Sequence, residues 1–445
     1  MISFMGSCLN PAVPAISQDP GNGSMEIVWI ITAYMLASAA LPVPVSGLAG
    51  RISNESVLTS GLGLFAAASA GGMAAQSLKG LILFRILQGT GTALIYSTGM
   101  AVLTQKEEAA ERRKLLGYST AATCLGLTAG PAAGGVINAL LGWRWIFTAA
   151  AALAGAAFLA AFFQNIRLKR EARHIRSLHF SSSMKVPYPF GESVIYVISI
   201  TLLITGLSYV SKSAWAWSAA AGGVFAGAYF IVKEIRSSRP LIPVKLFRKR
   251  PVLFCSCAAA MTHYGTGFGM NFMLSLYLQN VMGFSSQKAG LFLVIYPAVQ
   301  SVVSVFAAKS GISTRFLSSA GMLGLSAAAA GLGFVKENGT IGYILLWTVC
   351  AGVFCGFFAA ANTAVIMETA GERNRTTAAA ILSTLRSLGN ALSMAAVSSV
   401  SAAYIGQESL EAVGADMFLQ IMQNIMFLWS GLCILGFFMA LKKKM

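Results

Sequence analysis

Apolar residues run through this chain in long stretches separated by short polar segments. A helix needs about 20 consecutive, mostly apolar residues to cross the hydrocarbon core of a bilayer. We predict a membrane-spanning helix in each of fourteen stretches, at about 1–17, 27–49, 56–77, 80–104, 116–140, 143–164, 191–210, 214–232, 251–280, 286–308, 314–335, 341–367, 377–404 and 420–441. The first stretch is short and lacks the basic leader of a cleaved signal peptide. It forms either a short span or the end of a helix that begins upstream.

The composition is that of a chain embedded in lipid. Only 11% of the residues are charged and 56% are hydrophobic, whereas a soluble domain carries roughly 25% charged residues. The net charge of +17 does not indicate nucleic acid as a partner, because the basic residues lie in short loops between apolar stretches. The seven cysteines all fall in apolar stretches without metal-ligand spacing, so we expect buried free thiols. We expect no metal and no cofactor.

The basic residues predict the orientation of the chain in the membrane. The loops after even-numbered spans, together with the C-terminal tail, hold 25 of the 32 lysines and arginines, and the other loops hold five. Basic loops stay on the cytoplasmic side, so we expect both termini in the cytoplasm. The other two basic residues, Arg85 and Arg386, lie inside predicted spans.

Two long basic connections divide the chain into bundles. Residues 165–190 and 233–250 are polar and basic, and a single predicted helix pair, 191–232, lies between them. We therefore predict an all-α polytopic membrane protein with its helices arranged as 6+2+6. Residues 1–164 and 251–441 would form the two six-helix bundles, and 442–445 a basic tail.

A glycine-rich segment, from Gly117 to Gly135, is the most distinctive part of the sequence. Gly126, Gly130 and Gly134 are spaced four residues apart, so on a helix they form one smooth stripe. Small residues let two membrane helices approach closely, and we predict that another helix packs there. The residues of this motif are Gly117, Gly126, Gly130, Pro131, Gly134 and Gly135.

These residues and the fourteen-span pattern resemble the major facilitator superfamily, in particular its fourteen-span drug:proton antiporters. The segment meets the pattern G-x8-G-x3-G-P-x2-G-G in full, and residues 81–91, with Arg85 and Gln88, resemble the family's helix-four motif. The resemblance implies two bundles around a central cavity, with alternating access to its two sides. It also implies efflux of small amphipathic compounds in exchange for protons, by a protein that is not an enzyme. We expect a monomer in the cell membrane of a prokaryote.

The sequence departs from the family pattern in two places. The loop between helices two and three usually carries an acid, and Gly50 stands at that position, between Gly47 and Arg51. The acid that many drug antiporters carry in helix one is also absent, since the segment from Ser7 to Pro11 has none. The alternatives are therefore a uniporter, a lipid or precursor flippase without proton coupling, or a membrane scaffold that transports nothing. A channel is disfavoured because the sequence has no filter segment and no ring-forming charge pattern.

Ionisable groups inside a membrane are costly and therefore candidates for function. No carboxylate lies near the middle of a predicted span, which leaves Arg85, His263 and Arg386 as candidates for proton coupling. Arg85 either extends to the outer interface or faces the cavity. Arg386 requires a buried partner, such as Asn362 or a backbone carbonyl, and could hold an anionic group or stabilise the contact between the bundles. His263 is a structural donor, a proton carrier or a contact for the substrate.

Uncharged polar residues inside the spans are candidates for lining the substrate path. They are Asn10, Gln88, Tyr264, Asn271, Gln279 and Asn362.

Overall fold

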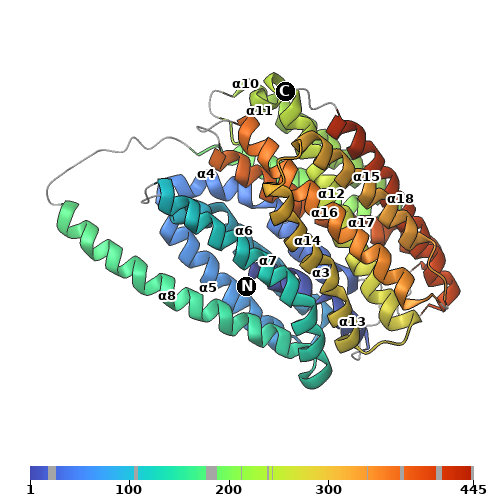
Figure 1. Cartoon of the computed structure of the whole chain (residues 1–445). Helices are drawn as coiled ribbons and strands as arrows, with labels where there is room; N and C mark the ends of the chain where they lie inside the picture. The colour runs from blue at the N-terminus through green and yellow to red at the C-terminus, as the bar shows by residue number, and fades with distance from the viewer. Residues whose placement is uncertain are drawn as a thin grey trace.

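The computed structural model describes residues 1–18, 27–104, 109–176, 188–211, 213–237, 240–242, 244–337, 339–370, 375–406 and 413–441. Helices make up almost all of these residues, and no strand occurs among them (Figure 1). The protein is thus all-helical wherever the structure describes it, as the sequence predicts.

The helices of the N-terminal half are α1 (Ile2–Cys8), the 3-10 helix η1 (Asn10–Ala12), α2 (Val13–Ser17), α3 (Val28–Ala40), α4 (Pro42–Ile52), α5 (Asn54–Ala74), α6 (Leu78–Thr104), α7 (Ala109–Leu141) and α8 (Arg144–Arg176). The central pair consists of α9 (Phe190–Tyr209) and α10 (Ala214–Arg236). The remaining helices are α11 (Val244–Lys249), α12 (Pro251–Leu276), the π-helix η3 (Tyr277–Val281), α13 (Ser286–Leu293), α14 (Ile295–Lys309), α15 (Thr314–Gly333), α16 (Ile341–Ala370), α17 (Arg375–Ile405) and α18 (Ala415–Leu441).

Each predicted span coincides with a helix or a run of short helices. In the described part of the chain, eleven helical segments are long and apolar enough to cross a membrane, and the apolar part of α7 is shorter than that. The helical positions are confirmed, whereas the count of fourteen spans stays a prediction.

Proline explains where two of the predicted spans are interrupted. Pro11 and Pro14 lie where the first segment divides into α1, η1 and α2, and Pro42 begins α4 directly after α3 ends. Proline lacks the backbone N–H and its ring clashes with the carbonyl four residues back, so it is tolerated in the first turn of a helix and disrupts its interior.

The two halves of the chain touch along a small set of helices. In the N-terminal half, α5 packs against α6 and α8, and α1 packs against α7; in the C-terminal half, α15 packs against α16 and α18, and α12 against α17. Contacts between the halves run from α7 to α13 and from α3 to α17 (Figure 1). The pair α9–α10 joins this arrangement because α9 packs against both α17 and α3.

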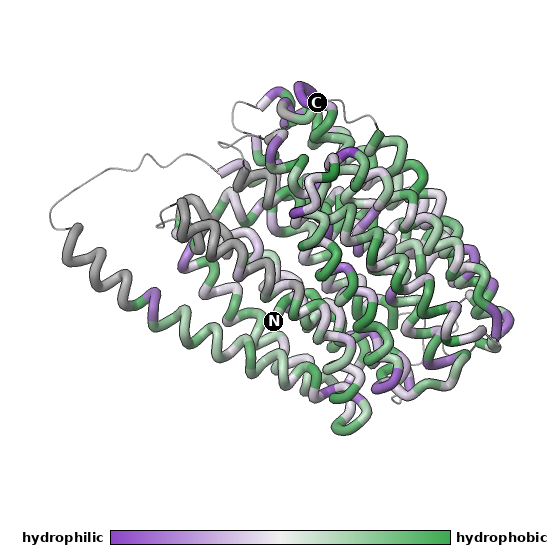
Figure 2. The backbone as a smooth tube through the Cα atoms, viewed as in Figure 1, coloured by the Kyte–Doolittle hydropathy of each residue, from purple (hydrophilic) through white to green (hydrophobic). Residues whose placement is uncertain are grey.

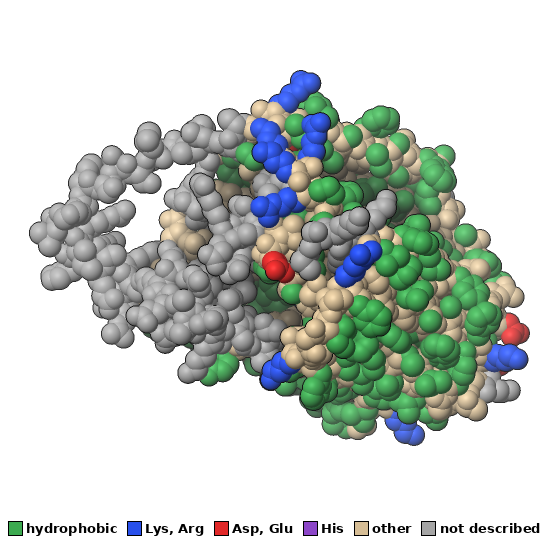
Figure 3. All heavy atoms as spheres, turned by 45° about the horizontal axis from the view of Figure 1, so that its top comes forward, with side chains coloured by type: hydrophobic (Ala, Val, Ile, Leu, Met, Phe, Trp, Pro, Cys, Tyr) green, Lys and Arg blue, Asp and Glu red, His purple; other side chains and the backbone are tan. Residues whose placement is uncertain are grey.

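The surface has the distribution expected of a protein surrounded by lipid. Large apolar side chains are exposed along the outer helices, for example Leu153, Phe225, Phe306 and Leu435. Hydrophobic segments occupy the length of the helices, and hydrophilic segments gather toward their ends (Figure 2). Figure 3 shows several lysine and arginine side chains at the end of the molecule that carries α11 in Figure 1. Which end of the molecule faces the cytoplasm stays a prediction from the basic loops.

Candidate functional site

Arg85 lies inside the N-terminal half, enclosed by α3 and its own helix α6. Its Nε donates to the carbonyl oxygen of Ile30 (2.8 Å), and its terminal nitrogen donates to Oε1 of Gln88. The guanidinium carbon lies 4.1 Å from the centre of the Tyr34 ring, a cation–π contact. Only 1% of Arg85 is exposed. The prediction that Arg85 could extend to the interface is therefore wrong, because the side chain is held by partners within the bundle.

Gln88 extends this polar cluster to a third helix. Its Nε2 donates to Oγ of Ser69 on α5 (2.7 Å), and Ser69 in turn donates to the carbonyl of Phe65 (2.7 Å). The Thr92 hydroxyl donates to that of Tyr34 (3.1 Å). Buried polar groups must be paired to avoid a desolvation penalty, and this cluster pairs them across α3, α5 and α6. The hydrogen bonds found here among the described residues involve no carboxylate.

His263 lies in the C-terminal half, within a group of aromatic rings. It is 1% exposed, its ring stacks on Phe358 of α16 with centroids 4.2 Å apart, and it meets Tyr264 edge to face at 5.3 Å. Its Nδ1 has no hydrogen-bond partner among the described residues. An imidazole with a spare nitrogen can donate to or accept from a further group.

Arg386 of α17 joins the same group from the neighbouring helix. Its terminal nitrogen donates to the Tyr264 hydroxyl (3.3 Å), and its guanidinium carbon lies 4.5 Å from the centre of the Tyr264 ring. The guanidinium also interacts electrostatically with His263 and, across the boundary between the halves, with Tyr96 of α6. The structure thus brings together three of the sequence candidates, and this cluster faces the N-terminal half.

The Tyr264 hydroxyl is a partner of Arg386 that the sequence did not suggest. Asn362, which the sequence suggested as a partner, donates from Nδ2 to the carbonyl of Ser256 (3.1 Å) on α12. Asn390 was not identified from the sequence. When the Asn390 amide is turned so that its nitrogen faces the two nearby carbonyls, that nitrogen donates to the carbonyls of Arg386 (3.2 Å) and Tyr264 (3.0 Å). The available signal was its position on α17, one turn after Arg386.

The remaining polar candidates lie apart from these clusters. Asn10 is 2% exposed in η1, and Gln279 in the π-helix η3 donates to the carbonyl of Ser275 (3.2 Å). The oxygen of Asn10 and that of Asn271 have no hydrogen-bond partner among the described residues. None of the hydrogen bonds found in the described part of the chain joins these three residues to Arg85 or Arg386.

The glycine stripe of α7 lies against the N-terminal helix α1. A Cβ atom at Gly126 would approach the backbone nitrogen of Phe4 to 3.2 Å, and one at Gly134 would lie 2.0 Å from the carbonyl oxygen of Cys8. At Gly130 the nearest atom would be the Ser7 hydroxyl. Only glycine lets the two backbones approach so closely, so this face of α7 fixes α1 within the N-terminal half. Gly117 lies nearer the start of the same helix.

The last glycine of the motif faces the other half of the protein. A Cβ at Gly135 would lie 2.3 Å from the carbonyl oxygen of Ser286, the first residue of α13. On the other side, a Cβ at Gly290 would lie 2.3 Å from the carbonyl oxygen of Pro131. The Ser286 hydroxyl donates to the carbonyl of Gly135 (3.4 Å). One motif therefore serves two contacts, one within a bundle and one between the halves.

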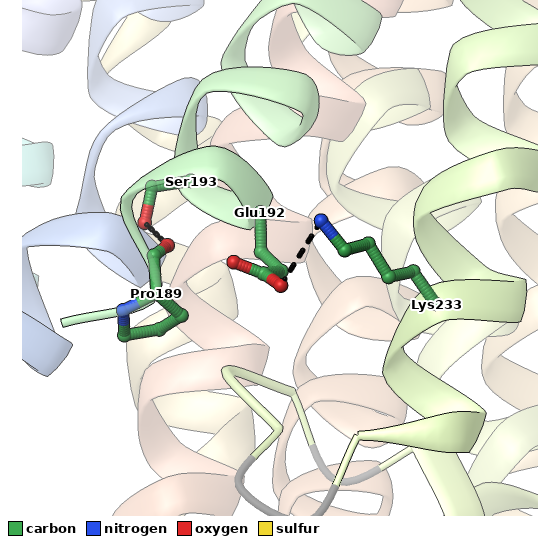
Figure 4. A network of polar contacts seen from close by, with 4 residues as sticks. All are labelled: Pro189, Glu192, Ser193 and Lys233. Atoms are coloured by element: carbon green, nitrogen blue, oxygen red, sulfur yellow. Dashed lines mark hydrogen bonds and ion pairs between the residues drawn. The ribbon is translucent and has the colours of Figure 1, made fainter. Parts of the chain in front are cut away.

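The first turn of helix α4 is attached to the central helix pair. The Tyr188 hydroxyl donates to the carbonyl of Pro44 (2.8 Å), and Ser193 donates to the Tyr188 hydroxyl (2.7 Å). Next to this contact, Lys233 of α10 forms an ion pair with Glu192 of α9 (3.1 Å; Figure 4). The side chain of Arg51, in the segment predicted to join helices two and three, lies outside the described residues. These contacts connect the cytoplasmic end predicted for helix two to α9 and α10.

The fold and the site define a multi-pass membrane transporter: helical bundles with apolar outer surfaces and a buried polar cluster in each half. In the described residues, no group of three or more histidine, cysteine, aspartate or glutamate side chains could hold a metal ion. Residues 1–394 match the pattern of the Major Facilitator Superfamily, and the chain belongs to this family.

Several known proteins that are similar in sequence to this chain are resistance proteins. The chain is 27% identical to the methylenomycin A resistance protein of Streptomyces coelicolor, over 87% of this chain and 80% of that protein. It is 25% identical to the tetracenomycin C resistance and export protein of Streptomyces glaucescens, over 91% and 74% of the two chains. Among solved structures, the POT family transporter PepTSo superposes with a TM-score of 0.67 at 12% identity, covering 98% of this chain and 94% of that one.

Proposed function

We propose that the protein exports small amphipathic compounds across the cell membrane by alternating access, the two halves rocking about a site at their boundary. The observation that carries this proposal is the contact between α7 and α13, where Gly135 and Gly290 bring the backbones of the two halves together. Such a contact is formed without interlocking side chains, so it can separate and re-form as the halves move. The resistance and export proteins among the relatives support the direction of transport.

The same proposal includes the topology and setting expected from the sequence. Fourteen spans arranged as 6+2+6, with both termini in the cytoplasm, fit the helical positions and the distribution of basic residues. The bacterial relatives support a prokaryotic cell membrane. We propose that the transporter acts as a monomer.

Exchange for protons is the proposed source of energy. His263 is the one histidine within a predicted span, and histidine is the side chain whose unperturbed pKa lies near neutrality. It lies in the same cluster as Arg386, while Arg85 is buried in the other half. Uniport, or movement of a lipid or precursor without proton coupling, is the alternative, favoured by the absence of carboxylates from the middle of the helices.

Efflux driven by a pH gradient tests this proposal in proteoliposomes. With an imposed gradient, His263→Ala and Arg85→Ala should each reduce efflux to about a tenth of the wild-type rate or less, because each removes a group proposed to take part in proton coupling; a tenfold loss of rate corresponds to about 1.4 kcal/mol. The control is His174→Ala, in the predicted connection between the bundles. If efflux by the wild-type protein does not depend on the imposed pH gradient, proton exchange is contradicted and uniport is favoured.

A further inference from the structure

The charges inside the helices are of one sign. All fifteen aspartates and glutamates lie between helices or within five residues of a helix end. By contrast, Arg85 is the eighth residue of α6, and Arg386 the twelfth of the 31 residues of α17. Near the middle of the predicted membrane spans, the sequence thus places two arginines and no carboxylate.

The two arginines differ in their access to a further ligand. Arg85 is enclosed, since only 1% of it is exposed and its neighbours hold it on several sides. Arg386 is partly exposed although it lies near the middle of a long helix. Its helix packs against α12 on one side and α3 of the other half on another, and its charge acts on Tyr96 of α6. Arg386 therefore lies at the boundary between the halves, where alternating access requires a cargo site.

The groups around Arg386 suit an anion. Tyr264 provides a hydroxyl and His263 an imidazole whose Nδ1 has no partner among the described residues. Both can donate a hydrogen bond to a bound acceptor, and a guanidinium binds a carboxylate with two parallel bonds. The rings of Phe358 and Tyr264 both contact His263, so aromatic side chains lie next to these donors.

We propose that the cargo is an organic anion, namely a small amphipathic carboxylate whose charged group binds Arg386 between α12 and α17 while its apolar part lies against the neighbouring aromatic rings. This inference rests on the proposed export function and adds the chemical class of the substrate. Binding of a cationic cargo at this place would be unfavourable, because its charge and that of Arg386 repel each other in a medium of low dielectric constant. The middle of the predicted spans also has no carboxylate to bind a cation.

A matched set of three fluorescent probes tests the inference on the purified full-length protein. Dansylglycine is an anion, dansylglycinamide is its neutral counterpart, and N-(2-aminoethyl)dansylamide is a cation at neutral pH. We expect dansylglycine to bind about tenfold more tightly than the amide, because it adds a charge-assisted contact, and the cation to bind no better than the amide. Equal affinity for all three probes would overturn the inference.

Variants of Arg386 test whether this residue causes the tighter binding of the anionic probe. Arg386→Gln should remove the tenfold preference for the anion, and Arg386→Lys should keep a part of it because the charge remains. Arg315→Gln removes the same charge from an exposed position at the start of α15 and should change nothing. A preference for the anion that persists in Arg386→Gln would overturn the assignment. If Arg386→Gln does not fold, Tyr264→Phe, which removes only the hydroxyl that Arg386 contacts, should weaken anion binding selectively, and an unchanged preference there would contradict the site.

Efflux of the same probes separates this inference from the proposed function. Export of the cation together with equal binding of all three probes would contradict the anion site and leave export standing. Binding that prefers the anion and depends on Arg386, without efflux of any probe from proteoliposomes, would contradict export and leave the anion site standing.

Discussion

Gly134→Ala should lower the free energy of unfolding by about 2 kcal/mol, within the range measured for overpacked cores. The added Cβ would lie 2.0 Å from the carbonyl oxygen of Cys8 and 2.7 Å from its carbon. Both atoms belong to the backbone of α1, so no side-chain rotation relieves the clash and α1 must move away from α7. At Gly130 the nearest atom is the Ser7 hydroxyl, which can rotate, and Gly130→Ala should be milder.

The control for this prediction is Gly155→Ala in α8, where a Cβ would meet no atom within 4 Å. Alanine is favoured over glycine inside a helix by about 0.5–1 kcal/mol, so this variant should be neutral or slightly stabilised. The thermal unfolding midpoint of the purified protein in detergent measures both variants. If Gly134→Ala unfolds at the same temperature as Gly155→Ala, the close packing of α1 on α7 is not present in solution.

Gly135→Ala and Gly290→Ala should each lower the rate of transport about tenfold, with little loss of stability. Each added Cβ would lie 2.3 Å from a backbone oxygen of the other half, that of Ser286 or Pro131. The clash arises between the halves and not within one, so it can be relieved by separating them at this contact. The equilibrium would then shift away from the state in which α7 and α13 touch, and transport requires that state to form in every cycle.

Labelling of a cysteine at Ser286 measures this shift. In the Ser286→Cys background, a water-soluble maleimide should react about tenfold faster once Gly135→Ala is added, equivalent to a shift of about 1.4 kcal/mol. Gly155→Ala in the same background should leave the rate unchanged. Unchanged labelling together with normal efflux in Gly135→Ala would show that this contact does not take part in the cycle.

Arg85 and Arg386 illustrate which part of the candidate site the sequence could predict. The apolar stretches placed Arg85 and Arg386 inside helices, and the resemblance of residues 81–91 to a family motif singled out Arg85 and Gln88. The hydrogen-bond partners of the two arginines could not be predicted from the sequence, because Ile30 lies 55 residues from Arg85, and Tyr264 lies 122 residues from Arg386. Which side chains meet depends on how each helix is rotated about its axis, and that is set by packing between distant segments.

The sequence by itself determined where the helices lie, which loops are basic and which face of α7 is smooth. These properties are local: a run of apolar residues favours a helix in lipid, and a spacing of four residues defines a helix face. Only the tertiary structure decided that Gly134 meets α1, that Gly135 meets α13, and that Arg386 meets Tyr264. Neighbouring residues of one motif face different helices because successive positions on a helix point in different directions, and the position of each neighbouring helix is fixed by the packing of the whole chain.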